Sequence, residues 1–156
     1  MLSFIVNVDR PGTAFEIYSI DVPISRVHMR IMIIDDDPLS LKSLKNALQL
    51  NGFSVDAYTD PTEAWARYDV EPYDLVMTDI MMHPMDGIEL LRLIRQRSSR
   101  TCVIVFTGHH LESVQKNAMS TGADYYYTKP IPIEEIISIV HGTRRLTEHN
   151  PKRDDQ

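Results

Sequence analysis

Six side chains able to bind a metal ion or a phosphoryl group follow four separate apolar runs of the sequence. They are Asp35, Asp36, Asp37, Asp79, Thr107 and Lys129. Carboxylates that lie close together penalise one another's charged form, and a hard divalent cation such as Mg²⁺ relieves this repulsion. An ammonium group cannot bind the metal, but it can bind an anion that the metal also holds. If these residues meet in the fold, they predict phosphoryl transfer to Asp79 as an acyl phosphate.

The sequence around these residues alternates short apolar runs with amphipathic stretches from residue 30 onward. The runs cover residues 31–34, 53–58, 75–77, 102–106 and 125–127. The other stretches repeat apolar residues at spacings of three and four, which predicts helices with one buried face. The residues predicted to form these buried faces, one set for each helix in chain order, are Leu41, Leu44 and Leu48; Ala64, Trp65 and Tyr68; Leu90, Leu93 and Ile94; Leu111, Val114 and Ala118; and Ile133, Ile136, Ile137 and Val140.

Helix-end signals agree with this division. Asp37 and Asp60 each precede a proline, so each is predicted to be an N-cap before a proline at the first helical position. Gly52 and Gly122 follow the first and fourth helices, where a left-handed residue is expected. Five repeats of strand and helix predict an α/β fold, in which a parallel sheet carries helices on both faces.

The polarity of the runs predicts the order of the strands. Residues 31–34 and 102–106 are apolar throughout, which is typical of strands covered on both faces, whereas residues 53–58 alternate as an edge strand does. We expect a doubly wound five-stranded parallel sheet of order 2-1-3-4-5, with another three-layer α/β order as the alternative. Ligands bind such sheets beyond the carboxyl ends of the strands, where five of the six side chains would stand while Asp37 caps a helix.

Composition limits the class of protein. The chain has 156 residues, of which 43% are hydrophobic and 24% charged, and this argues against disorder. A net charge of −6 argues against binding nucleic acid, and no apolar run approaches the roughly 18 residues of a membrane span. Cys102 is the only cysteine, which excludes an intramolecular disulfide. We expect a cytoplasmic domain without a signal peptide.

One domain is expected over residues 30–145. Residues 1–29 do not follow the strand–helix rhythm, and we interpret them as an N-terminal extension, either a loose arm or a small hairpin that turns at Pro11 and Gly12. A start codon placed too early is a further alternative. Residues 146–156 are predicted to be a charged C-terminal tail.

Several short motifs together resemble the response-regulator receiver domains of two-component signalling, across residues 30 to about 145. The matching stretches are IIDDDP at 33–38, DLVMTD at 74–79, MDG at 85–87, VIVFTG at 103–108 and GADYYYTKP at 122–130. Gly87 also lies eight residues after Asp79, as it does in that family. The resemblance implies a CheY-like, flavodoxin-like (βα)5 fold with the strand order predicted above.

The resemblance implies roles for the acidic residues. Asp79 would accept the phosphoryl group. Asp36 would bind Mg²⁺ directly, and Asp35 would act through a water molecule or by orienting the site. Asp79 and the backbone carbonyl of Met81 would complete the protein's contribution to the metal site.

The resemblance also implies how the signal would leave the site. Thr107 and Lys129 would hold the phosphoryl oxygens, and Tyr126 would be the switch aromatic. Lys129 and Pro130 would share a cis peptide bond in the turn that follows the last strand.

Two loops depart from the family's pattern. Pro84 stands one place later than the proline of the family's usual loop, which puts the shape of this loop in doubt. Met81 and His109 occupy positions that tune the phosphoryl lifetime in the family. A methionine cannot orient an attacking water, whereas His109 could do so or could simply be an exposed loop residue. His83 and His110 are interpreted as surface residues.

The implied function is that of a phosphoacceptor that promotes only its own phosphorylation and dephosphorylation and is not an enzyme in the usual sense. Its partners would be a sensor histidine kinase or phosphotransfer protein and an unidentified downstream protein. A phosphorylation-dependent homodimer is a further expectation, while direct contact with nucleic acid or membrane is not. The main alternative is an interaction module that kept the fold but is not phosphorylated. A Mg²⁺-dependent phosphohydrolase and a nucleotide-binding protein are disfavoured, because Met81 replaces a second acid and no glycine-rich loop follows the first strand.

Overall fold

The computed structural model of the chain describes residues 29–148, in which strands and helices alternate without exception. The elements are β1 (Arg30–Ile34), α1 (Pro38–Leu50), β2 (Ser54–Tyr58), α2 (Pro61–Val70), β3 (Leu75–Asp79), α3 (Gly87–Arg97), β4 (Cys102–Thr107), α4 (Glu112–Thr121), β5 (Tyr125–Thr128) and α5 (Ile133–Glu148). The expected extension at 1–29, apart from Met29, lies outside the described residues, as does most of the expected tail at 146–156. Helix α5 continues to Glu148, past the domain end expected at residue 145.

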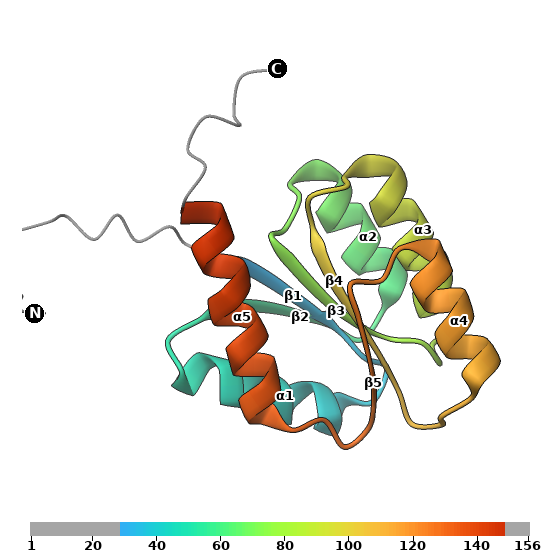
Figure 1. The fold of residues 1–156 in the computed structure, drawn as a ribbon, viewed down its shortest axis with the longest axis horizontal. Helices are drawn as coiled ribbons and strands as arrows, with labels where there is room; N and C mark the ends of the chain where they lie inside the picture. Colours follow the sequence, from blue (N-terminus) through green and yellow to red (C-terminus); the bar gives the residue numbers. More distant parts are fainter. Residues whose placement is uncertain (1–28, 149–156) are drawn as a thin grey trace, which may run out of the picture.

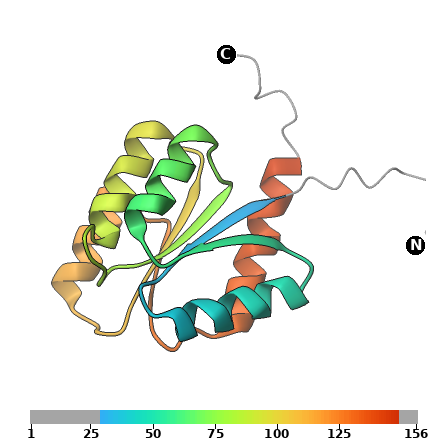
Figure 2. The same cartoon turned by 180° about the vertical axis from the view of Figure 1, so that it is seen from behind.

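The five strands form one parallel sheet of order β2-β1-β3-β4-β5, which confirms the predicted fold class and strand order. Helices α1 and α5 cover one face of the sheet, and α2, α3 and α4 cover the other (Figure 1, and from behind in Figure 2). The chain reverses its direction of winding between β1 and β3, so this sheet offers a ligand site beyond the ends of those two strands.

Two apolar cores lie on opposite faces of the sheet. Ile31 and Ile33 of β1 are buried in the core under α1 and α5, whereas Met32 and Ile34 are buried in the core under α2, α3 and α4. This two-sided burial explains why the run is apolar throughout. Among the helices of residues 29–148, none is long and apolar enough to cross a bilayer.

The structure confirms the helix ends that were predicted from N-cap aspartates and from glycines after helices. Asp37 accepts hydrogen bonds from the backbone N–H groups at the start of α1, and Asp60 does the same for α2. Gly52 has φ of +83° and Gly122 has φ of +110°, so both adopt the left-handed conformation expected after a helix.

Helix α4 differs from its prediction at its first turn. Ala118 is buried and Val114 is half-buried, as the pattern predicts, but Leu111 is 56% exposed. The structure places Leu111 before the helix, at the N-cap position and with extended backbone, where the helical spacing no longer applies. The prediction that Leu111 belongs to the buried face is therefore wrong.

Candidate functional site

The candidate site lies at the C-terminal edge of the sheet. This edge is formed by the C-terminal ends of the five strands and is distinct from the edge strands β2 and β5. Asp35 follows β1, Asp79 ends β3, Thr107 ends β4 and Lys129 follows β5. Parallel strands bring these four ends together although the residues are up to 94 positions apart in sequence. Asp37 stays outside the group because its side chain caps α1.

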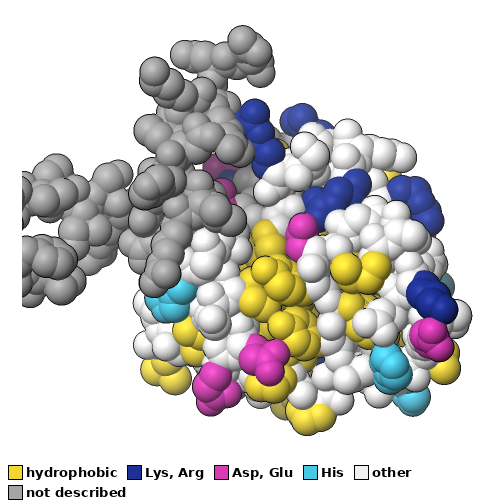
Figure 3. All heavy atoms as spheres, viewed as in Figure 1, with side chains coloured by type: hydrophobic (Ala, Val, Ile, Leu, Met, Phe, Trp, Pro, Cys, Tyr) yellow, Lys and Arg dark blue, Asp and Glu magenta, His cyan; other side chains and the backbone are white. Residues whose placement is uncertain are grey.

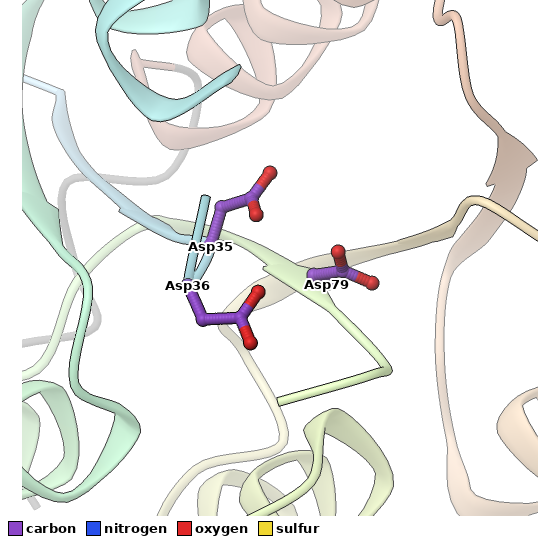
Figure 4. Close-up of side chains that lie close together, drawn as sticks. All are labelled: Asp35, Asp36 and Asp79. Carbon is purple, nitrogen blue, oxygen red and sulfur yellow. The ribbon is translucent and has the colours of Figure 1, made fainter. Parts of the chain in front are cut away.

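Three carboxylates face one another at this edge. Figure 4 shows the side chains of Asp35, Asp36 and Asp79 close together, and one carboxylate oxygen from each lies within 4.8 Å of the other two. Asp35 is 1% exposed and Asp79 is 5% exposed, whereas Asp36 is open to solvent. The cluster therefore combines two buried carboxylates with one that is accessible to solvent.

Lys129 is the only ammonium group that bridges this cluster in the described part of the chain. Its Nζ donates to Asp35 Oδ2 at 2.7 Å and to Asp79 Oδ2 at 2.6 Å. Burial on its own lowers the pKa of Lys129, but the hydrogen bonds to Asp35 and Asp79 and the charges of both carboxylates outweigh burial and raise this pKa. One positive charge against three carboxylates leaves the site negative, so it favours a further cation.

The donor atoms of the cluster fit Mg²⁺. All the side-chain ligands are carboxylate oxygens, which this hard cation prefers, and the exposed side of Asp36 leaves room for the waters that Mg²⁺ retains. Soft ligands are absent from the cluster of described residues that could hold a metal. A zinc or copper site is disfavoured for the same reason.

Backbone packing fixes the position of Asp79. Its Oδ1 accepts a hydrogen bond from the Met81 N–H at 3.1 Å, which leaves Oδ2 to Lys129. Behind it, Gly87 presses against the Asp79 backbone so closely that a Cβ at this position would lie 2.0 Å from the Asp79 carbonyl oxygen. A glycine is therefore required eight residues after Asp79, whatever its φ.

Thr107 and Tyr126 lie on the neighbouring strands. Thr107 is 2% exposed, and its Oγ accepts a hydrogen bond from the His109 N–H at 3.3 Å. The Tyr126 hydroxyl is buried beside the backbone of Leu111, but it has no hydrogen bond to a described residue. Burial raises the pKa of Tyr126.

Two features of the loops were not predicted from the sequence. His110 is exposed, as predicted, yet its ring also packs edge-to-face against the Tyr126 ring, with centroids 6.2 Å apart. The His83–Pro84 peptide bond is cis, as is the Lys129–Pro130 bond that the resemblance implies. The contact between the two rings could not be predicted, because no sequence pattern indicates that a loop residue packs against a strand residue. Of the two residues, only Tyr126 was singled out from the sequence, by its position three residues before Lys129.

Comparison with known proteins gives one consistent result. The family model of the response regulator receiver domain matches residues 31–141. The transcriptional regulatory protein TrcR of Mycobacterium tuberculosis is 30% identical over 128 residues, which are 82% of this chain and 50% of TrcR. The response regulator MprA of Mycobacterium avium is 32% identical over 120 residues, which are 77% of this chain and 53% of MprA. The chain thus spans about half the length of these curated relatives.

Solved structures agree with the sequence comparison. The receiver domain of a Francisella response regulator has a TM-score of 0.70 and 29% identity, and the match covers 76% of this chain and 98% of that domain. A two-component response regulator from Clostridium difficile also has a TM-score of 0.70, with 28% identity over 75% of this chain and 96% of that one.

Proposed function

Because the chain belongs to the response regulator receiver family of two-component systems, we propose that Asp79 accepts a phosphoryl group from a partner protein's phosphohistidine, with the help of Mg²⁺. The observation that carries this proposal is the contact of one ammonium, Lys129, with two buried carboxylates beside the exposed Asp36. This arrangement is negative as it stands, and a cation together with a phosphoryl group would complete it.

The reaction would form one bond and break one. A carboxylate oxygen of Asp79 forms a bond to phosphorus while the phosphorus–nitrogen bond of the phosphohistidine breaks, and the departing imidazole nitrogen keeps the electron pair. Asp36, Asp35, Asp79 and the Met81 carbonyl would hold Mg²⁺, which when bound neutralises charge on the phosphoryl oxygens. Lys129 would turn from the carboxylates to a phosphoryl oxygen, and the Thr107 hydroxyl would donate to another.

The phosphoryl donor would dock at the same edge of the sheet. Leu39 at the start of α1 is 76% exposed and Met81 after β3 is 67% exposed, although both are large apolar residues. Each lies within four residues of a carboxylate of the cluster. We expect them to pack against the kinase or phosphotransfer protein that brings the phosphohistidine.

The downstream partner would bind a different face. Leu111, Met119 and Tyr125 are exposed apolar residues on α4 and β5 and in the segment before α4. Figure 3 shows hydrophobic side chains gathered on the face between α5 and α4. A change at Thr107 would reach this face through β4 and β5, and a second copy of the chain is one partner that could bind there. The acidic chain would contact proteins in the cytoplasm rather than nucleic acid or membrane.

A direct test uses acetyl phosphate as the donor. The chain is incubated with acetyl phosphate and Mg²⁺, and mass spectrometry is expected to show a gain of one phosphoryl group. Asp79→Ala should remove this gain while circular dichroism stays unchanged. Asp37→Asn is the matched control, because it removes a neighbouring charge but keeps an N-cap side chain, and it should be modified like the wild type.

The result distinguishes a phosphoacceptor from an interaction module with the same fold. If the wild type gains no phosphoryl group, the chain is an interaction module that does not switch. If Asp79→Ala is modified as fully as the wild type, the acceptor is a different residue and the assignment of Asp79 is wrong.

A further inference from the structure

Met81 is the most exposed methionine of residues 29–148. It is 67% exposed, and the next is Met119 at 45%, while Met85 is half-buried. The buried methionines are Met29, Met32, Met77 and Met82. A peroxide oxidises a thioether only where it can reach the sulfur, so among these residues Met81 is expected to react first.

The backbone of Met81 is fixed beside Asp79. Its N–H donates to Asp79 Oδ1 at 3.1 Å. Because the N–Cα bond adds about 1.46 Å, the Met81 Cα lies no more than about 4.6 Å from that carboxylate oxygen. The side chain is unbranched and has three rotatable bonds, so its sulfur can turn toward the carboxylate from the solvent side.

Oxidation gives this side chain a group that it lacks. The sulfur of a thioether is only a weak hydrogen-bond acceptor. When it reacts with hydrogen peroxide, a sulfur lone pair attacks one peroxide oxygen, an S–O bond forms and the O–O bond breaks. The leaving hydroxide takes the proton of the transferred oxygen and departs as water, so sulfur is oxidised by two electrons and the peroxide is reduced. The product is a sulfoxide, a polar side chain with an oxygen acceptor.

We propose that Met81 is an oxidation site at which hydrogen peroxide shortens the lifetime of the phosphoryl group on Asp79. The sulfoxide oxygen accepts a hydrogen bond from a water molecule and holds it for attack on phosphorus. The new P–O bond forms while the bond to the Asp79 oxygen breaks, the carboxylate keeps the electron pair, and the proton of the water passes to solvent. The place of oxidation follows from exposure alone, whereas its effect on lifetime rests on the function proposed above.

The place of oxidation is tested by treating the full chain with hydrogen peroxide and following each methionine by tandem mass spectrometry. Met81 should be oxidised before Met119, and Met32 and Met77 should lag by more than roughly tenfold, because they react only when the fold opens. Cys102 should also react slowly, because burial raises the pKa of its thiol to about 11 and keeps it protonated. Oxidation of Met119 as fast as that of Met81 would overturn the assignment of the site.

The effect on lifetime is tested on protein phosphorylated with acetyl phosphate and Mg²⁺. After the donor is removed, mass spectrometry follows the loss of the phosphoryl group. Peroxide-treated wild type should lose it roughly two- to tenfold faster than untreated wild type, which is the range that one added hydrogen bond supplies. Treatment with methionine sulfoxide reductases for both epimers should restore the slower rate.

Three variants assign the effect to Met81. Met81→Gln places an amide oxygen at the position of the sulfoxide oxygen, so it should lose the phosphoryl group as fast as oxidised wild type without any peroxide. Met81→Leu cannot be oxidised and should keep the slower rate after treatment. Met119→Leu is the matched control, because it removes the other exposed methionine, and it should respond to peroxide like the wild type.

The outcomes distinguish this proposal from the function on which it rests. A peroxide effect that persists in Met81→Leu, or an unchanged rate in wild type whose Met81 is fully oxidised, would overturn the effect on lifetime and leave phosphorylation of Asp79 standing. If the wild type gains no phosphoryl group, the proposed function fails and the effect on lifetime falls with it. The preferred oxidation of Met81 then stands or falls on the peroxide measurement alone.

Discussion

The polar groups at the two edges of the sheet, where the strands begin and where they end, are paired to different extents. At the N-terminal edge, where the strands begin, Arg95 donates to the carbonyl oxygens of Gly122 and Thr101 and to Asp124 Oδ2, each at 2.7 Å. The Thr101 hydroxyl lies 2.5 Å from the Tyr68 hydroxyl and donates to a backbone carbonyl. These polar groups all have partners within the protein.

At the C-terminal edge, the negative charges outnumber the positive ones. Asp35 and Asp79 share one ammonium, Lys129, and Asp36 adds a further negative charge to the cluster. Among residues 29–148, the Thr107 hydroxyl has a single hydrogen bond, a long one of 3.3 Å from the backbone N–H of His109. The comparison teaches that the same fold pairs its polar groups at one edge and leaves unbalanced negative charge at the other, which is where we propose that ligands bind.

The largest effect is expected at Gly87, where the acidic edge depends on backbone packing. Gly87→Ala places a Cβ 2.0 Å from the Asp79 carbonyl oxygen, so the backbone must shift. We expect a loss of about 3 kcal/mol in the free energy of unfolding by urea denaturation, the upper end for overpacking. Gly108→Ala is the control, because a Cβ there meets nothing within 4 Å and stability should hold. A stable Gly87→Ala with normal phosphorylation would show that Asp79 is not held by this contact.

A smaller effect is expected from the N-terminal edge. Arg95→Met keeps much of the apolar stem but removes charged hydrogen bonds to two carbonyls and a carboxylate, and should cost about 2 kcal/mol in urea denaturation. Phosphorylation of the folded protein should be unaffected, because the site lies at the other edge. Arg97→Met, which removes a solvent-exposed ion pair with Asp69, is the control and should change little. Loss of phosphorylation in folded Arg95→Met would contradict the division between the edges.

At the acidic edge, removing a charge should affect binding rather than folding. Asp36→Asn relieves repulsion with Asp35 and Asp79, so the free energy of unfolding without metal should hold or rise slightly, while the affinity for Mg²⁺ falls at least tenfold by calorimetric titration. Asp37→Asn changes the neighbouring residue without touching the cluster, and its affinity should stay near that of the wild type. Equal affinities in the two variants would remove Asp36 from the metal site.

The smallest effect at neutral pH concerns Cys102, at the start of β4. Burial, followed by the charge of Asp124, raises the pKa of the Cys102 thiol to about 11 from an ordinary value of 9.0. Since the folded pKa exceeds the unfolded one, this contribution to stability is fully present below about pH 9 and is lost as the pH rises toward 11. The difference in stability between the wild type and Cys102→Ala should therefore be constant up to pH 8 and should shift against the wild type by pH 10. A pH-independent difference would contradict the raised pKa.

Local signals made most of the fold predictable. Asp37 and Asp60 cap their helices because the cap geometry needs only an acceptor and the next two or three residues. The strand order followed from burial, since β1 is covered on both faces and β2 only in alternation. Leu111 was misassigned because its spacing from Val114 fits a helix that has not yet begun at that residue.

The site was predictable in its residues but not in its contacts. The topology rule alone places Asp35, Asp79, Thr107 and Lys129 at one edge, and the structure brings them there. The sequence could not show that Lys129 touches both carboxylates, because such a contact depends on side-chain rotamers set by packing. The roles of these residues in phosphoryl transfer remain predictions.

The position of β1 between β2 and β3 has a consequence for how the chain acquires its structure. β1 is the first strand of residues 29–148, yet it pairs with residues 54–58 on one side and 75–78 on the other. During synthesis, β1 leaves the ribosome before either of the two strands with which it pairs. Until those strands emerge, its apolar residues are exposed and must avoid aggregation and non-native pairing. β4 then pairs with the free side of β3, and β5 pairs with β4, so each of these strands finds a partner that is already in place.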